Sequence, residues 1–311
     1  MLQLAWISLM LAWGCAPAHL RLEYASLSSA AMARKMDYAV YAPPEWDGHR
    51  RIPLVLFLHG GGDKVDCFDR AALGEHLDRA YRAGSLPPAL IVIPQGGYGF
   101  WEDWADGSRS YRSWVLKDLL PHVQDRYAVE PCPEGCHVMG ISMGGHGALR
   151  FALLEPEYFA SVTAISAPIF DTERMLRFRD NSWMRLFVPM KRIWGAAVDP
   201  REIERDDLFV QWQEPADLNG VRLGLAWGSE DRTGIMLSST RFHEHLDRGH
   251  IPHEWLVFEG GHNWKAWTPV IEWALRTQVG HDTDPISPES RPTGQNRPTF
   301  EAGEVGTNSV E

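Results

Sequence analysis

The sequence lacks the clusters of positive charge that nucleic-acid-binding and membrane-surface proteins carry. Its 30 lysine and arginine residues are outnumbered by 41 aspartates and glutamates, which gives the 311-residue chain a formal net charge of −11. With no run of basic residues, we expect neither nucleic acid nor an anionic membrane surface as a partner. The excess of negative charge favours solubility. No internal repeat is visible either, which argues against a solenoid or propeller.

Long apolar runs are also missing. The N-terminal apolar stretch, residues 4–13, is far shorter than the roughly 20 residues that a membrane-spanning helix needs. No integral membrane span is therefore expected. The stretch has the length of a signal-peptide core, and Cys15 behind it resembles a lipoprotein box, although no basic residue precedes it. Residues 1–20 are interpreted as an export or lipoprotein signal, or else as an N-terminal element packed on the body, which leaves localisation open between export and the cytoplasm.

Cysteine is scarce, with four residues in the chain. Cys132 and Cys136 lie four positions apart, just before an expected strand. A zinc site would need further ligands at suitable spacing, and the adjacent His137 alone does not supply them. We therefore expect no metal. A local disulfide in an exported protein and two free thiols remain the alternatives for this pair.

Short apolar runs of strand length alternate with longer helical patterns along the chain. Residues 36–43 alternate like an exposed strand, whereas residues 52–60 form a continuous apolar run that is typical of a buried parallel strand. This order predicts an α/β fold with a mostly parallel sheet and helices on both faces. Further strands are expected at 89–96, 136–142, 159–168, 221–228 and 253–261, and helices at 67–84, 110–127 (interrupted near Pro121), 144–156 and 265–279.

Two segments differ from the rest in composition. Residues 169–216 have no clear strand and are rich in aromatic residues and methionine, so we expect a helical insertion that caps the carboxyl edge of the sheet, with ordinary helical packing as the alternative. Residues 281–311 are rich in Pro, Ser, Thr, Gly and Glu and are expected to be disordered. The remaining chain, residues 21–280, is expected to be a single domain.

Residues 140–144 read Gly-Ile-Ser-Met-Gly, a G-x-S-x-G frame centred on Ser142. The frame falls where an expected strand ends and a helix begins, which is the setting of a nucleophile elbow. Small neighbours fit the sharp turn, and the helix N-terminus favours the negative charge that develops during attack. Ser142 is therefore the candidate nucleophile, and the backbone N–H of Met143 is a candidate oxyanion donor.

A serine nucleophile needs a base and a carboxylate that orients the base. Asp231 and His262 follow two successive expected strands, in the order Ser-Asp-His that is typical of this arrangement. Both should lie at the carboxyl edge of the sheet, where open α/β sheets gather their sites. Glu230 is the rival of Asp231, and His146 is expected to be structural.

The second oxyanion donor should come from the loop after an early strand. Residues 59–62 read His-Gly-Gly-Gly, so the backbone can approach a developing oxyanion closely. Gly61 is the preferred donor and Gly62 the next. A glycine-rich turn without a ligand is the alternative.

Aromatic residues near these motifs are candidates for the lining of a substrate pocket. Phe100, Trp101 and Trp104 belong to one loop, and Trp264 and Trp267 follow the candidate base. Packing in the core is the alternative for Trp264 and Trp267.

Taken together, the motifs LHGGG, GISMGGHGAL, GSED and GGHNWKAW resemble the esterase D, antigen 85 and feruloyl esterase branch of the α/β-hydrolases. They are spread over residues 52–267, and the last one is similar to that family's G-H-x-W-x-x-W pattern. The resemblance implies an α/β-hydrolase fold and serine ester chemistry without a metal or organic cofactor. It also implies a Ser142, Asp231 and His262 triad. It does not cover the insertion or the tail.

The function expected from these features is hydrolysis of a small-molecule carboxylic ester through an acyl-enzyme. An acyltransferase of the antigen 85 type shares the triad and stays an alternative, as does a serine peptidase, although the extra domain usual in such peptidases is absent. A non-catalytic binding protein on the same fold would be expected to have lost a triad residue, and none is lost. The particular ester and the oligomeric state stay open.

Overall fold

The structure of the chain is a computed structural model that describes residues 22–180, 188–195, 204 and 207–280. The expected signal segment, residues 1–20, and the expected tail, residues 281–311, lie outside the described residues, as does part of the insertion. The described residues belong to one compact unit.

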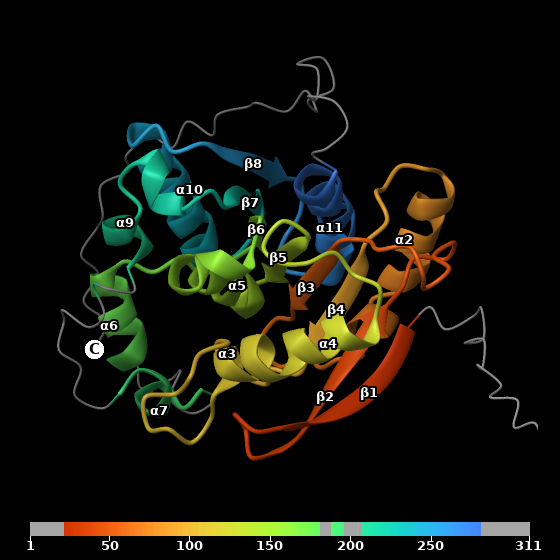
Figure 1. The fold of residues 1–311 in the computed structure, drawn as a ribbon. Coiled ribbons are helices and arrows are strands. Elements are labelled where there is room, and N and C mark those ends of the chain that lie inside the picture. Colours follow the sequence, from red (N-terminus) through yellow and green to blue (C-terminus); the bar gives the residue numbers. More distant parts are fainter. Residues whose placement is uncertain (1–21, 181–187, 196–203, 205–206, 281–311) are drawn as a thin grey trace, which may run out of the picture. The chain divides into compact units, whose positions relative to one another are not determined.

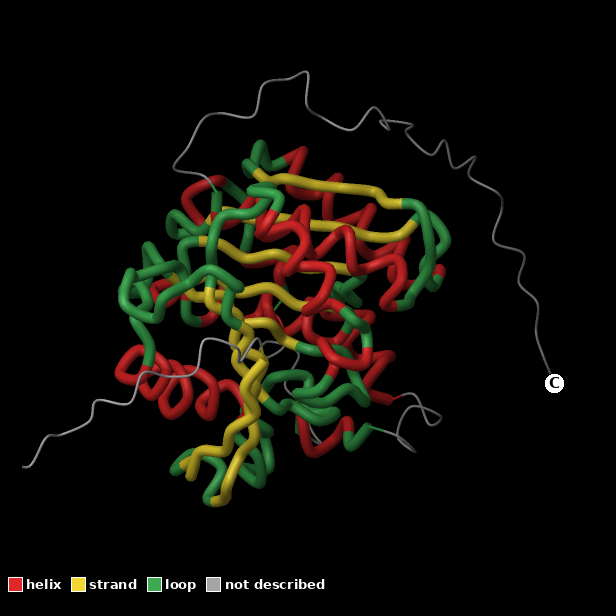
Figure 2. Tube along the Cα trace, turned by 90° about the vertical axis from the view of Figure 1, so that its right-hand side faces the viewer, coloured by secondary structure: helices red, strands yellow, loops and turns green. Residues whose placement is uncertain are grey.

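An eight-stranded sheet organises this unit, and the side view of Figure 2 shows its strands following one another with a twist. The order across the sheet is β1-β2-β4-β3-β5-β6-β7-β8. The first two pairs, β1 with β2 and β2 with β4, are antiparallel, and all later pairs are parallel. The strands are β1 (Leu22–Ser29), β2 (Arg34–Tyr41), β3 (Leu54–Leu58), β4 (Leu90–Pro94), β5 (Cys136–Ile141), β6 (Ser161–Ile165), β7 (Arg222–Gly228) and β8 (His253–Phe258).

Both faces of the sheet are covered because alternate residues of its central strands point to opposite sides. In β3, Leu54, Leu56 and Leu58 belong to one hydrophobic core, while Val55 and Phe57 belong to the other. All five are buried, as expected for a continuous apolar strand. The mostly parallel sheet with helices on both faces is the α/β-hydrolase fold that the sequence predicts.

The helices divide between these two cores (Figure 1). The helices of the smaller core are α1 (Cys67–Arg70), α2 (Leu73–Arg82) and α11 (Trp264–Val279). Residues of the π-helix η1 (Trp114–Leu119), α4 (Leu120–Arg126), α5 (Met143–Leu154) and α10 (Thr233–Arg248) pack in the larger core. A short helix, α3 (Tyr111–Ser113), leads into η1.

The prediction of an exposed strand at residues 36–43 was wrong for most of its length. In β2, the last four residues, Tyr38 to Tyr41, are all buried. The reason is that both faces of β2 are packed, because Tyr38 and Val40 belong to the larger core and Ala39 and Tyr41 to the smaller one. Strand β1, which the sequence analysis missed, pairs along its outer edge. Polar groups inside the strand find partners, since the Tyr41 hydroxyl donates to Asp78.

Two predicted helices are divided in the structure. The helix expected at 67–84 is α1 followed by α2, and Ala72 between them has a left-handed backbone with φ of 52°. The helix expected at 110–127 is interrupted, as predicted, but by the π-helical segment η1 rather than by Pro121 itself. Pro121 lies in the first turn of α4, where its missing N–H costs little.

The described part of residues 169–216 contains helices and no strand. These elements are α6 (Thr172–Asp180), α7 (Met190–Trp194), α9 (Leu208–Gln211) and the first residues of the 3-10 helix η4 (Pro215–Leu218). Phe170, Phe178 and Trp194 pack with Phe100 in one aromatic cluster. In the described range, the segment is therefore helical and packs against the loop after β4.

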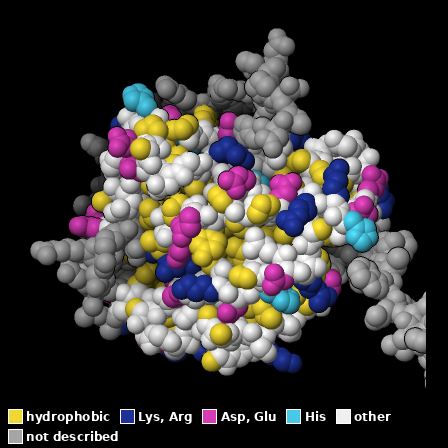
Figure 3. Space-filling view, viewed as in Figure 1, with side chains coloured by type: hydrophobic (Ala, Val, Ile, Leu, Met, Phe, Trp, Pro, Cys, Tyr) yellow, Lys and Arg dark blue, Asp and Glu magenta, His cyan; other side chains and the backbone are white. Residues whose placement is uncertain are grey.

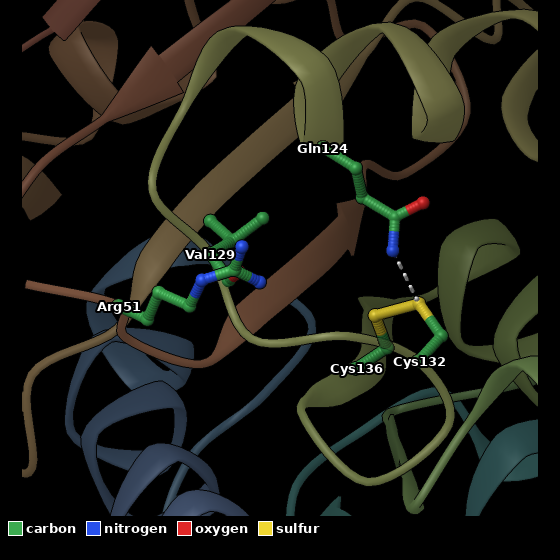
Figure 4. The surroundings of a disulfide bond; sticks show 5 residues. All are labelled: Arg51, Gln124, Val129, Cys132 and Cys136. Atoms are coloured by element: carbon green, nitrogen blue, oxygen red, sulfur yellow. Dashed lines mark hydrogen bonds between the residues drawn. A yellow bond between two sulfur atoms is a disulfide. The ribbon is translucent and has the colours of Figure 1, made fainter.

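The cysteine pair forms a disulfide. Cys132 and Cys136 are bonded, and the bond closes the turn that enters β5 (Figure 4). Gln124 Nε2 donates to Cys132 Sγ over 3.4 Å, so α4 contacts this turn. The other described cysteine, Cys67, is a buried free thiol whose pKa is raised by burial.

Charge on the described surface is mixed. Figure 3 shows acidic and basic side chains interspersed over the face in view. No helix in the described ranges is both long and apolar enough to cross a membrane.

Candidate active site

Ser142 lies in the sharp turn between β5 and α5. Its backbone has φ of 53° and ψ of −122°, a conformation that non-glycine residues rarely adopt. The turn is held by two backbone hydrogen bonds, from Ser142 N to Ile165 O at 2.8 Å and from His146 N to Ser142 O at 3.1 Å. The serine therefore stands at the carboxyl edge of the sheet and at the N-terminus of a 12-residue helix.

Two glycines of the frame are required by close backbone approach. A Cβ at position 144 would overlap the carbonyl oxygen of Leu58 on the neighbouring strand, and one at position 140 would overlap the carbonyl group of Gly144. Neither clash involves a side chain that could move away. The G-x-S-x-G spacing is thus a packing requirement of the turn that presents Ser142.

Ser142, His262 and Asp231 form one hydrogen-bonded chain. His262 Nε2 lies 2.8 Å from Ser142 Oγ, and His262 Nδ1 lies 2.8 Å from Asp231 Oδ1. Because a carboxylate can only accept, Nδ1 carries the proton, and Nε2 is left with the lone pair that accepts from the serine hydroxyl. The structure thus brings together the three residues that the sequence analysis selected.

Asp231 is buried, whereas its sequence rival Glu230 is exposed. Burial acts to raise the pKa of Asp231. Hydrogen bonds from His262 and Ser166, together with the N–H of Arg232, outweigh burial and hold that pKa below its ordinary value. Asp231 is therefore ionised at neutral pH and available to orient His262.

Ser166 is a residue near the triad that the sequence analysis missed. It follows β6, is fully buried and has a left-handed backbone with φ of 49°. Its hydroxyl accepts a 2.9 Å hydrogen bond from Trp267 Nε1 and contributes to the lowered pKa of Asp231. Trp267 also packs edge-on against the His262 ring, with centroids 4.8 Å apart. The sequence around Ser166 contains no recognisable motif, because it is a single serine that follows an apolar run.

The glycine-rich loop after β3 lies beside the serine. An added Cβ on Gly60 would be 3.5 Å from the Ser142 Cβ, and one on Gly61 would be 3.8 Å from the Met143 sulfur. Among the described residues, no hydrogen bond uses the N–H of Gly61 or of Met143. Both residues line the same cavity as Ser142, while Gly62 packs under Tyr98 and does not.

His59 fixes the shape of this loop. The N–H of Gly96 donates to His59 Nε2 at 3.0 Å, so the proton sits on Nδ1, which bonds Gly60 O at 2.8 Å. Burial lowers the pKa of His59, which keeps the ring neutral and compatible with this pattern. The histidine of the His-Gly-Gly-Gly stretch is therefore a support for the loop rather than a second base.

The triad opens into a cavity of about 910 Å³. Ser142, Met143, Gly61 and His262 line it on the side of the sheet. Aromatic rings line other parts of the wall, from Tyr98, Phe100, Phe170, Phe178 and Trp267. The charged side chains of the lining are three arginines, Arg174, Arg177 and Arg232, and Asp63, whose carboxylate is paired with Arg70 at 2.8 Å.

Three tryptophans expected in the pocket do not line this cavity. Trp101 is fully buried and packs edge-on against His59, with ring centroids 5.0 Å apart. Trp104 stacks under the guanidinium of Arg192, and Trp264 packs on Phe57 and Trp267. Trp101 is thus part of the core, and Trp104 and Trp264 are partly buried against it. Phe100 and Trp267, from the same sequence stretches, line the cavity.

A second serine–histidine pair lies inside the sheet. His137 Nδ1 is 2.7 Å from Ser161 Oγ, on neighbouring strands β5 and β6. Both residues are buried, and burial with the nearby Arg222 lowers the pKa of His137 to about 3. A pair enclosed in this way has no access to substrate, so it is structural. His146, likewise buried, bonds Pro168 O through Nδ1.

The chain is also similar to proteins of known family. A family model described as "Putative esterase" matches residues 29–277. Esterase MT1326 of Mycobacterium tuberculosis is 26% identical over 261 residues, which cover 78% of this chain and 56% of that protein. S-formylglutathione hydrolase of Bos taurus is 30% identical over 162 residues, covering 44% of this chain and 54% of the relative. The chain thus spans little more than half the length of these two relatives.

Solved structures share the fold. A ferulic acid esterase superposes with a TM-score of 0.68 at 21% identity, over 83% of this chain and 97% of that one. The MPT51 protein of Mycobacterium tuberculosis gives a TM-score of 0.67 at 19% identity, with 83% and 98% covered. At sequence identities this low, the similarity to these structures is a similarity of fold.

Proposed function

Because the chain belongs to the esterase family whose model spans residues 29–277, we propose that it is a serine carboxylic-ester hydrolase acting on small-molecule esters. One observation carries the proposal: an unbroken chain of two 2.8 Å hydrogen bonds, from Asp231 through His262 to Ser142, ends in a cavity. A buried carboxylate, a neutral imidazole and a strained serine are the parts that acyl transfer to serine needs.

In the first half-reaction, Ser142 Oγ attacks the ester carbonyl carbon while its proton passes to His262 Nε2. The carbonyl π electrons move to the oxygen, which the N–H groups of Met143 and Gly61 stabilise. Asp231 holds the imidazole in the correct tautomer and stabilises the imidazolium. The C–O bond to the alcohol then breaks, and the alkoxide leaves with the proton from His262.

The second half-reaction returns the enzyme to its starting state. His262 Nε2 takes a proton from water, whose oxygen attacks the acyl carbon. The tetrahedral intermediate collapses, Ser142 Oγ leaves with the proton from His262, and the carboxylic acid is released. The N-terminus of α5 faces the developing negative charge in both halves.

The cavity lining favours a substrate with an apolar, preferably aromatic, portion and a negative charge. Phe100, Phe170 and Phe178 offer the apolar wall. Arg174, with a 3.8 Å contact to Asp171, and Arg177, paired with Glu173, supply positive charge in a chain that is acidic overall. We therefore propose esters that carry a carboxylate or a similar anion away from the scissile bond.

The test is steady-state hydrolysis of short and long 4-nitrophenyl esters by the wild type and by Ser142→Ala. The wild type should release 4-nitrophenol, and the variant should lose about 10⁴-fold or more in kcat. Ser161→Ala is the matched control, because it removes the hydroxyl of the other serine–histidine pair and should retain activity. Equal activity of wild type and Ser142→Ala, or no hydrolysis of any ester by the wild type, would contradict the proposal.

A further inference from the structure

Helix α10 and strand β8 bring two histidines and an aspartate together outside the active site. His243 and Asp247 are four residues apart on α10, and His253 is the first residue of β8. One ligand atom from each residue lies within 4.8 Å of the others. We propose that these three side chains form a binding site for a divalent transition metal ion, with zinc as the best match. The site rests on no part of the proposed esterase activity.

The donor set suits zinc. Two imidazole nitrogens and one carboxylate oxygen are ligands that Zn²⁺ takes in tetrahedral sites, with the fourth position free for water. Calcium and magnesium prefer oxygen ligands alone and do not match two imidazoles. Among the described residues, no other group of three or more such side chains is close enough to hold an ion.

The tautomer of His253 is already set for metal binding. Its Nδ1 lies 2.8 Å from the carbonyl oxygen of Ile251, which can only accept, so Nδ1 carries the proton. The lone pair of the neutral ring is therefore on Nε2, the atom that faces His243. A backbone carbonyl bonded to the remote nitrogen is the usual support of a metal-ligating histidine.

The separations between the ligand atoms bracket those of a bound ion. Ligands about 2.0–2.2 Å from a tetrahedral zinc lie roughly 3.3–3.6 Å apart. With Nδ1 as the ligand atom of His243, the two nitrogens His243 Nδ1 and His253 Nε2 are 2.8 Å apart, and an Asp247 oxygen lies 3.9 Å from His253 Nε2. Binding thus requires His243 Nδ1 to lose the proton that it donates to His253 Nε2, the two rings to part by about half an ångström and the carboxylate to move inward by a similar amount.

The three ligand side chains differ in how far they are buried. The His253 and His243 side chains are 3% and 14% exposed, so only small shifts are open to them, whereas Asp247 is 63% exposed and free to move. The indole of Trp255 packs against the His243 ring, with centroids 4.5 Å apart, and restricts its tilt. The two imidazole nitrogens already face each other, and the exposed carboxylate would close the site from the solvent side.

An ion at this position would join two elements that adjoin triad residues in the chain. Helix α10 begins two residues after Asp231, and β8 ends four residues before His262. Among the described strands, β8 is also an edge strand and pairs with β7 alone. Metal binding should therefore stabilise the fold at this edge of the sheet. Its effect is measured as a change in thermal stability, not as a change in ester turnover.

The experiment starts from full-length protein stripped with a chelator and dialysed. Titration calorimetry with zinc chloride should give one ion per chain, and zinc at about 100 times its Kd should raise Tm by roughly 5–10 °C. Asp247→Asn and His243→Gln should each weaken zinc binding at least about 10-fold, since each removes one of three ligands. Asp247→Asn alters an exposed side chain, so its effect is separable from a folding defect.

Two variants serve as controls. His250→Gln removes an exposed histidine next to the site, and His262→Ala removes the histidine of the active site. Both should bind one zinc ion with wild-type affinity. Absence of stoichiometric binding by the wild type would overturn the proposal, as would equal affinity of Asp247→Asn, His243→Gln and the wild type.

Discussion

At the scale of single residues, the strongest signals in the sequence are the ones that the backbone geometry requires. Ser142 has a positive φ, and Gly140 and Gly144 are the neighbours that leave room for it, so the motif could be found without a structure. Ser166 could not, because its role depends on a bond to Trp267, 101 positions away in the chain. The positions of Asp231 and His262 were predictable because both follow strands at one edge of the sheet.

Another residue-scale consequence concerns His137, which is enclosed in the sheet as a neutral ring with a pKa of about 3. In the unfolded chain the pKa of this ring is near 6.5. Between pH 6.5 and 3 the unfolded state therefore binds more protons, and folding stability decreases as the pH is lowered. We predict that between pH 7 and pH 5 this residue costs the wild type about 2 kcal/mol of unfolding free energy. Urea unfolding at both pH values measures the loss.

The variant His137→Gln isolates this contribution. Glutamine can bond Ser161 but does not titrate, so the decrease in unfolding free energy between pH 7 and pH 5 should be smaller by about 2 kcal/mol than in the wild type. The same change at the exposed His250 should leave the decrease as it is. An identical pH dependence in His137→Gln and the wild type would mean that folding does not lower the pKa of His137.

At the scale of elements, secondary structure was predicted correctly where a strand is a continuous apolar run. The predictions failed where the tertiary surroundings of a segment determine its burial. The parallel strands were predicted because fully buried strands such as β3 and β5 read as apolar runs. Strand β1 was missed because it is half exposed and lies at the sheet edge. Trp101 was assigned to the pocket, yet only the path of its loop sends the ring into the core.

The contact between β3 and the start of α5 gives a second prediction. Gly144→Ala places a Cβ against the carbonyl oxygen of Leu58, where no side chain can yield. We expect a loss of about 1–3 kcal/mol in unfolding free energy, the usual cost of overpacking, together with a fall in kcat because the serine turn shifts. Denaturant unfolding and ester hydrolysis measure the two effects.

Gly234→Ala is the matched control for this substitution. Position 234 lies in the first turn of α10, and an added Cβ there meets no atom within 4 Å. Its unfolding free energy should change by no more than about 0.5 kcal/mol. If both alanine variants are equally stable, the close approach of β3 and α5 is not as tight as described.

Helix α6 gives a third prediction, through the charges it brings to the cavity. Arg174→Gln and Arg177→Gln should each raise KM about 5-fold for the 4-nitrophenyl monoester of a dicarboxylic acid, since one partly exposed charge pair is lost. The KM for a neutral ester of the same length should stay unchanged. The kcat should stay unchanged for both esters.

Arg248→Gln, at the far end of α10, is the control and should alter neither KM. Should the two α6 variants raise KM equally for neutral and anionic esters, the arginines shape the pocket without selecting charge. That outcome would refute the proposed anionic substrate and leave the esterase assignment standing.

At the scale of the whole molecule, strand order and function follow from the same rule. Parallel strands joined by helices bring their carboxyl ends to one edge, so Ser142, Asp231 and His262 meet although 120 residues separate the first from the last. The sequence could predict this meeting from motif order. It could not predict the cavity, because the lining combines loops and helix α6, which share no motif.

The most direct test of the account is covalent labelling of the nucleophile. A fluorophosphonate should react once per chain, Ser142 Oγ displacing fluoride, and mass spectrometry of the digested protein should find the adduct on the peptide that contains Ser142. The His262→Ala variant should label at least about 10³-fold more slowly, because the base that takes the serine proton is gone. An adduct on any other residue, or equal labelling rates in the wild type and His262→Ala, would contradict a triad centred on Ser142.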